Sequence, residues 1–194
     1  MAKREYGQRV GRLRRGNPNL PDGKWVPGIA NPDIGALVAQ VIVALPQIEE
    51  EMSPFFGRLL LLPTTSQDVA RQLLRSIRTS EGKIGAMSAV LQNSFVHAEK
   101  PTIFDDVIEA YDTIRTKRNL YAHGLWSTHE SGRVFVVKEN DDVDRFNEAD
   151  RREVNANELK GDLQRAADLL TKIREAVEWK DPNPIPHGKR RLTW

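Results

Sequence analysis

Seven consecutive residues place side chains that could act on a phosphodiester next to one another: Arg118, Asn119, Leu120, Tyr121, Ala122, His123 and Gly124. The guanidinium of Arg118 can bind phosphate oxygens through two parallel N–H donors. The imidazole of His123 can accept or donate a proton, because histidine is the side chain best suited to proton exchange near neutral pH. The carboxamide of Asn119 can orient that imidazole or bond to a phosphate oxygen.

A long amphipathic segment leads to these residues, and it predicts a helix over about residues 103–122. The residues of one helix face follow one another at steps of one, three or four positions: Phe104, Val107, Ile108, Tyr111, Ile114, Arg118 and Ala122. Thr102 and Asp105 have the spacing of a capping box. Gly124 is expected to end the helix because glycine tolerates a positive φ. Asn119 and His123 share a face, since they are four residues apart.

This combination resembles the HEPN superfamily (higher eukaryotes and prokaryotes nucleotide-binding domain), on the pattern R-x-x-x-x-H with a polar residue after the arginine. The pattern maps onto Arg118, Asn119 and His123. The resemblance is specific for this one helix, and it extends loosely over residues 33–179. It implies an all-α helical bundle, a homodimer, and a metal-independent endoribonuclease with these three residues as its catalytic site. Such an enzyme could act as a toxin or an antiviral effector, with an antitoxin or another regulatory protein as a partner.

The reaction that the resemblance implies is internal transesterification of RNA, in which the ribose 2′-OH attacks the adjacent phosphorus and the 5′-oxygen leaves. His123 would transfer the proton, and Arg118 would stabilise the charge of the transition state. One imidazole cannot be base and acid at the same instant. Two motifs facing each other across a dimer would supply two imidazoles, so a dimer is also a mechanistic expectation.

Two other interpretations stay open at this stage. The chain could be a catalytically silent module of the same type that binds RNA or a protein partner. It could be a purely structural dimer. Within such a structural role, His123 would be a favourable cation at a helix C-terminus, and Arg118 would pair with Asp112, Glu109 or an acidic group of a partner.

Charge is distributed unevenly along the 194 residues. Residues 1–24 hold seven basic and two acidic side chains, net +5, and residues 180–194 hold four and one, net +3. The region between them, with 18 basic and 24 acidic side chains, has a net charge of −6. We expect a flexible basic arm over residues 1–31, one helical domain over residues 32–180 and a basic tail over residues 181–194. The basic ends could contact RNA or could simply be solvated.

The remaining segments predict about four main helices and one hairpin. The first helix begins at Asn31 and keeps its period to about Met52, with a kink or a restart at Pro46 and a short second piece near residues 54–62. One long helix is expected over residues 66–95, in which glycines mark close helix packing. The strand-like runs 125–128 and 133–137 flank a turn and predict a β-hairpin that packs on the bundle. Asn155 and Glu158 cap a last helix.

Several classes of protein are excluded by composition. No apolar run approaches the roughly 20 residues that a membrane-spanning helix needs. The chain has no cysteine, which rules out disulfides and cysteine-based zinc sites and fits a cytoplasmic protein. We expect no cofactor and no metal ion: His123 and His129 lack a third nearby ligand, and there is no glycine-rich phosphate loop.

Overall fold

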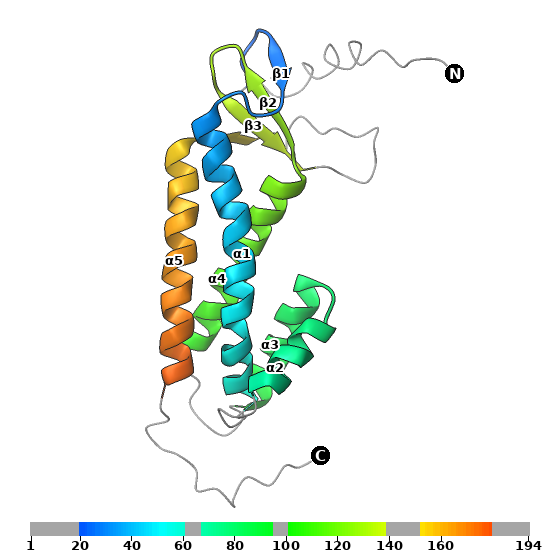
Figure 1. Cartoon of the computed structure of the whole chain (residues 1–194), viewed down its shortest axis with the longest axis vertical. Coiled ribbons are helices and arrows are strands. Elements are labelled where there is room, and N and C mark those ends of the chain that lie inside the picture. Colours follow the sequence, from blue (N-terminus) through cyan, green and yellow to red (C-terminus); the bar gives the residue numbers. More distant parts are fainter. Residues whose placement is uncertain (1–19, 61–66, 95–100, 139–151, 180–194) are drawn as a thin grey trace, which may run out of the picture.

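The computed structural model describes residues 20–60, 67–94, 101–138 and 152–179. These residues form five helices and four short strands, and three long helices make up most of the molecule (Figure 1). The prediction of a mainly helical bundle is confirmed, as is the small hairpin after the helix that carries Arg118, Asn119 and His123, which we call the motif helix. Most of the two predicted basic ends lies outside the described residues.

Helix α1 spans Pro32–Leu59 and is one continuous element. Its N-cap is Asn31, whose side-chain oxygen accepts hydrogen bonds from the backbone N–H groups of Asp33 and Ile34. The expected restart at Pro46 and the separate second piece were wrong, because one helix runs through both Pro46 and Pro54. Its buried apolar face continues along the whole length, and that packing outweighs the backbone hydrogen bonds that the prolines remove.

The long helix expected over residues 66–95 is instead two helices, α2 (Gln67–Ser76) and α3 (Ser80–Ser94). Thr79 ends the link between them, and its Oγ1 accepts a hydrogen bond from the backbone N–H of Gly82 at 3.0 Å. A Cβ on Gly82 would lie 2.8 Å from Cγ2 of Ile77, so this glycine allows the turn. The predicted close packing is wrong for Gly85, which has open space around it.

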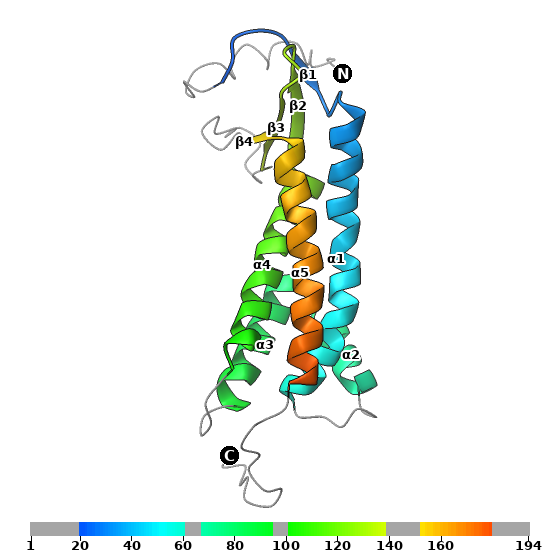
Figure 2. The same cartoon turned by 90° about the vertical axis from the view of Figure 1, so that its left-hand side faces the viewer.

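Helices α4 (Thr102–His123) and α5 (Ala156–Glu178) complete the bundle with α1. Figures 1 and 2 show that α1 and α5 run in the same direction and that α4 runs in the opposite one. The expected N-cap of α5 is confirmed, because the Asn155 side chain accepts a hydrogen bond from the backbone N–H of Glu158. The expected capping box of α4 is wrong: Pro101 is the N-cap, without a side-chain cap bond, and Thr102 is already helical.

A four-stranded antiparallel sheet covers one end of the bundle, in the order β1-β2-β3-β4 (Figure 1). The predicted hairpin is confirmed as β2 (Leu125–His129) and β3 (Val134–Val137), which turn at Gly132 with a φ of 83°. The sequence did not predict the edge strands β1 (Trp25–Pro27) and β4 (Arg152–Val154). Strand β1 lies within the segment that was expected to be a flexible arm.

Two buried apolar clusters hold these elements together. The larger one joins all five helices around Phe55, Phe104 and Tyr111. The smaller one joins the first turns of α1 and α5 to the sheet and to the last turns of α4, and it includes Val38, Tyr121 and Val136. The motif helix therefore ends where the bundle meets the sheet, and the smaller cluster holds these elements together at that point.

Candidate functional site

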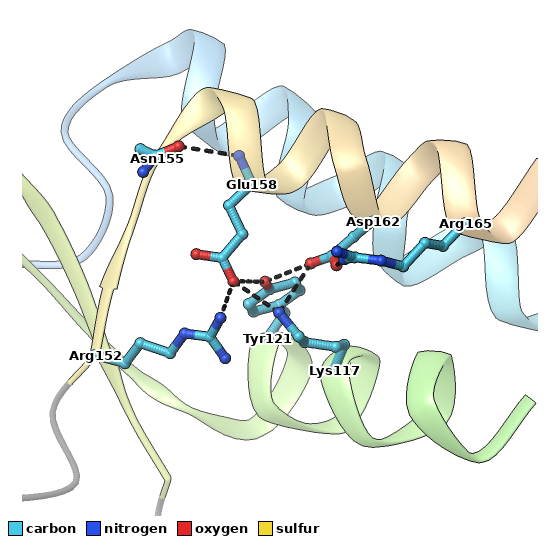
Figure 3. A network of polar contacts seen from close by, with 7 residues as sticks. All are labelled: Lys117, Tyr121, Arg152, Asn155, Glu158, Asp162 and Arg165. Carbon is cyan, nitrogen blue, oxygen red and sulfur yellow. Dashed lines mark hydrogen bonds and ion pairs between the residues drawn. The ribbon is translucent and has the colours of Figure 1, made fainter. Parts of the chain in front are cut away.

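The last two turns of α4 are anchored to α5 by a half-buried network of polar side chains, which Figure 3 shows from close by. The hydroxyl of Tyr121 donates a hydrogen bond to Oδ2 of Asp162 at 2.7 Å. Nζ of Lys117 lies 2.7 Å from Oε1 of Glu158 and 3.4 Å from Oδ2 of Asp162. Asp162 is only 4% exposed, so its charge depends on these donors.

Two further cations complete this network. Arg165 of α5 forms an ion pair with Asp162, and Arg152 of strand β4 forms one with Glu158 (Figure 3). Burial raises the pKa of the Tyr121 hydroxyl, and the hydrogen bond to Asp162 raises it further. The network therefore ties α4, α5 and the sheet together directly beside the motif.

Two hydrogen bonds to backbone carbonyl oxygens hold the end of α4 in place. The indole Nε1 of Trp126 donates a hydrogen bond to the carbonyl oxygen of Tyr121 at 2.9 Å, and the N–H of Gly124 donates one to the carbonyl oxygen of Leu120 at 2.8 Å. The expected positive φ at Gly124 is wrong, because its φ is −74°. The glycine is needed for space: a Cβ there would lie closer than 3.0 Å to Cγ2 of Val136.

The position of Arg118 follows from the contact between α4 and α1. The Tyr111 hydroxyl donates a hydrogen bond to Oε1 of Glu49 at 2.9 Å. The two helices are antiparallel, so two turns toward the C-terminus of α4 correspond to two turns toward the N-terminus of α1. Arg118 therefore lies two turns beyond the contact between Tyr111 and Glu49, toward the sheet end of α4.

The guanidinium of Arg118 is partly buried and has no acidic partner within residues 20–60, 67–94, 101–138 and 152–179. Its Nη1 donates a hydrogen bond to Oδ1 of Asn119 at 3.3 Å, while its Nε is enclosed and has no hydrogen-bond partner among the described residues. The alternative in which Arg118 pairs with Asp112 is not observed, because Asp112 binds Arg115. An ion pair with Glu109 is not observed within the described residues either.

The other arginines of similar burial in the described part of the chain differ from Arg118. Arg58 donates to the carbonyl oxygen of Trp179, Arg71 binds Asp68 and Glu50, and Arg115 binds Asp112 and Glu81. Each of these guanidiniums has an anionic or carbonyl oxygen within reach. The Nε atoms of Arg71 and Arg118 are both enclosed without a hydrogen-bond partner among the described residues, but Arg71 has two carboxylates within reach and Arg118 has none there. A buried N–H without a partner is destabilising by about 1–3 kcal/mol, so Arg118 is suited to binding an external anion.

His123 is exposed and is the last residue of α4. The structure joins Arg118 to Asn119 through a hydrogen bond, and it places His123 one turn beyond Asn119 on the same helix. The described contacts do not include one from His123 to either of them. The motif thus presents one exposed imidazole and one half-buried guanidinium at the junction of the bundle and the sheet.

His129 has a structural position instead. It is buried, and its ring packs edge-on against Trp25 at a centroid distance of 5.0 Å. Its Nδ1 lies 2.7 Å from the hydroxyl of Ser131, and its Nε2 lies 3.1 Å from the carbonyl oxygen of Asp22. Both ring nitrogens are therefore already in hydrogen bonds, one within the β2–β3 turn and one to the segment that precedes β1.

Sequence reasoning missed the network around Asp162. A usable signal was present, because Lys117 and Tyr121 are four residues apart, as are Glu158 and Asp162. Such pairs share a helix face, and Asp162 falls among the apolar positions of α5. The described part of the chain also contains a small hollow of about 110 Å³ between the helices, whose polar lining includes Glu49, Lys83 and Tyr111.

Comparisons with protein-family models, with curated proteins and with solved structures find no match to this chain. Over the described residues, no helix is both long enough and apolar enough to span a membrane.

Proposed function

We propose that the chain is a metal-independent endoribonuclease of the HEPN type, with Arg118, Asn119 and His123 as its site. The observation that carries this proposal is the state of Arg118: a half-buried guanidinium with no acidic partner in the described part of the chain, on the same last turns of α4 as an exposed imidazole. Arg58, Arg71 and Arg115 each bind a carboxylate or a main-chain carbonyl oxygen, whereas the described partner of Arg118 is the neutral side-chain amide of Asn119. The guanidinium N–H groups of Arg118 are therefore suited to donate hydrogen bonds to a phosphate.

The proposed reaction conserves atoms and charge without a metal ion. His123 takes the proton of the ribose 2′-OH, the 2′-oxygen bonds to phosphorus, and the bond from phosphorus to the 5′-oxygen breaks. The imidazolium of His123 in a second copy of the chain gives its proton to the leaving oxygen. Arg118 stabilises the negative charge that develops on the phosphoryl oxygens. Such an enzyme acts on cytoplasmic RNA, and the proposal includes a biological role as a toxin or an antiviral effector.

The contact between Arg118 and Asn119 also favours a second candidate function. Because Oδ1 of Asn119 accepts a hydrogen bond from Arg118, the two side chains form a unit that recognises phosphate and leaves His123 unoriented. A catalytically silent module that binds RNA or a protein partner would need no more than this unit. The two candidates differ in one respect, which is whether bound RNA is cut.

The test is cleavage of a labelled RNA by the purified chain and by matched variants. His123→Ala should lower the rate about 10²–10⁴-fold, and Arg118→Ala should lower it about 10²–10³-fold. Asn119→Ala should lower it less. Lys138→Ala removes an exposed cation directly after strand β3 and should leave the rate unchanged. RNA that is bound tightly but not cut would support the silent module, and equal cleavage by all four variants would contradict both candidates.

The role of the basic N-terminal segment can be tested by truncation, provided that the sheet stays intact. Deleting residues 1–24 would remove the carbonyl oxygens of Asp22 and Lys24, which accept hydrogen bonds from His129 and from the N–H of Glu130. Deleting residues 1–19 leaves both contacts in place. The shorter deletion should weaken RNA affinity and flatten its salt dependence, because fewer phosphate contacts release fewer counterions.

A further inference from the structure

The hollow between the helices lies away from the motif. Residues of α1, α2, α3 and α4 line it, and its volume is about 110 Å³. Figures 1 and 2 show α2 and α3 beside the half of α1 that is farther from the sheet. Tyr111 is the α4 residue of the lining, and it precedes Arg118 by about two helical turns. A molecule in the hollow would therefore occupy a site separate from the motif.

The inner part of the hollow is apolar except for one hydroxyl. Met52, Leu74 and Met87 are buried and line it, and so does Ser53, which is 4% exposed. A serine within a helix can donate a hydrogen bond to the carbonyl oxygen one turn earlier, as the threonine at position 113 does in α4. Within the described residues the Ser53 hydroxyl donates no such bond. Since buried polar groups normally have a partner, this hydroxyl can bind a molecule in the hollow.

Charged side chains of opposite sign face each other across the outer part of the hollow. The α1 side carries the carboxylates of Glu49 and Glu50, and the opposite side carries Lys83 of α3 and Arg75 of α2. Nζ of Lys83 lies 3.2 Å from Oε2 of Glu49, and Nη2 of Arg75 lies 2.8 Å from Oε1 of Glu50. The side chains of Glu50 and Arg75 are more than half exposed, so they mark the mouth.

Both sides can bind a further charged group without losing these contacts. An ammonium has three N–H donors and a carboxylate has about four acceptor sites. The described contacts of Lys83 use one N–H, and those of Glu49 use one site on each oxygen, for Tyr111 and for Lys83. A molecule that carries only one charge could use only one of the two sides.

We propose that the hollow binds a small zwitterion, namely an α-amino acid with a short apolar side chain. Its carboxylate accepts hydrogen bonds from Lys83 and Ser53, its ammonium donates to Glu49, and its side chain packs on Met52 and Met87. Methionine side chains adapt readily to such a contact. The volume equals that of about four water molecules at about 30 Å³ each, which excludes a nucleotide. This site goes beyond the proposed function and does not depend on it.

The methionines make a direct test possible, because the chain has only three. In a chain labelled with ¹³C at the methionine methyl groups, L-alanine should shift the signals of Met52 and Met87, with a dissociation constant on the order of 1 mM. The signal of Met1 should stay in place. Propionate lacks the ammonium and ethylamine lacks the carboxylate, so each should bind at least about 10-fold more weakly than L-alanine.

Two variants test the assigned contacts. Lys83→Met keeps the length of the side chain but removes the ammonium, and should raise the dissociation constant of L-alanine about 10–100-fold. Ser53→Ala removes only the hydroxyl, and should raise it about 2–10-fold. Lys160→Met is the matched control, because Lys160 is exposed on α5, and it should bind L-alanine as the wild type does. Circular dichroism checks that each variant is folded.

Three results would overturn the proposal. One is that neither Met52 nor Met87 shifts with L-alanine up to about 10 mM, or that Met1 shifts equally. Another is that propionate or ethylamine binds as tightly as L-alanine, since one charge would then suffice. The third is that folded Lys83→Met and Ser53→Ala both bind L-alanine as the wild type does. If Lys83→Met fails to fold, the comparison of the three probes and the result for Ser53→Ala still decide.

Discussion

Substitution of Gly124 by alanine tests how the motif helix ends. On backbone conformation alone, alanine should stabilise the fold by about 0.4–1 kcal/mol, because a φ of −74° is ordinary for any residue. The surroundings oppose this gain. A Cβ at this position would lie closer than 3.0 Å to the carbonyl oxygen of Leu120 and to Cγ2 of Val136, and 3.1 Å from the carbonyl oxygen of Val137.

The steric clash of the added Cβ should outweigh the gain from the stiffer backbone. Overpacking of this kind is destabilising by about 1–3 kcal/mol, and two of the three atoms are backbone oxygens that cannot rotate away. We therefore expect Gly124→Ala to lower the free energy of unfolding by about 2 kcal/mol. At about 2–4 °C per kcal/mol for a chain of this size, the melting temperature should fall by about 4–8 °C.

Thermal and urea unfolding followed by circular dichroism, at one fixed protein concentration, measure this effect. Gly161→Ala is the matched control, because Gly161 lies inside α5 with open space around it. That variant should gain about 0.5–1 kcal/mol, since alanine is the better helix former. A melting temperature of Gly124→Ala equal to or above that of the wild type would refute the close approach of the sheet to the end of α4.

Three further predictions concern stability. Tyr121→Phe removes the donor that Asp162 receives at 2.7 Å and should cost about 1–2 kcal/mol in urea unfolding; an unchanged midpoint would contradict the network in Figure 3. Asn31→Ala should cost about 1 kcal/mol through loss of the α1 cap, whereas Asn157→Ala at an exposed position should stay within about 0.5 kcal/mol of the wild type. Burial raises the pKa of Tyr111 and of Tyr121, helped by Glu49 and Asp162 respectively. Because tyrosines of the unfolded chain ionise near pH 10 while these two keep their protons, stability should be full below about pH 10 and should fall as pH rises above it. The urea midpoint should drop between pH 9 and pH 11, less steeply in Tyr121→Phe, and an equal or rising midpoint would contradict the raised pKa values.

The helical body could be predicted from the sequence because its signals are local. Periodic apolar positions fixed α4 and α5 to within a residue or two, and Asn31 and Asn155 marked two helix starts correctly. The hairpin was predicted for the same reason, since two strand-like runs flank Gly132.

The errors arose where contacts distant in sequence decide the structure. The two prolines of α1 signal a break locally, but burial along the whole helix overrides them. Trp25 and Arg152 lie in strands only because the hairpin offers edges for them to pair with. The reason for glycine at position 124 could not be found from sequence either, because it depends on the position of Val136 in β3.

At the candidate site, too, local features could be predicted from the sequence and contacts between distant residues could not. The order of Arg118, Asn119 and His123 on one helix end followed from their spacing. The missing acidic partner of Arg118 and the anchoring of Tyr121 by Asp162 depend on how three elements pack, so the sequence alone did not predict them.

The most direct test of the central claim is to identify the ends of the products formed from an RNA oligonucleotide in excess EDTA. We expect 2′,3′-cyclic phosphate and 5′-hydroxyl ends by mass spectrometry, and no cleavage of the same oligonucleotide with 2′-deoxyribose at the scissile nucleotide, because the 2′-OH is the nucleophile. His123→Ala and Arg118→Ala should yield almost no product. Products with 3′-hydroxyl and 5′-phosphate ends, or cleavage that persists in both variants, would contradict the assignment of this site.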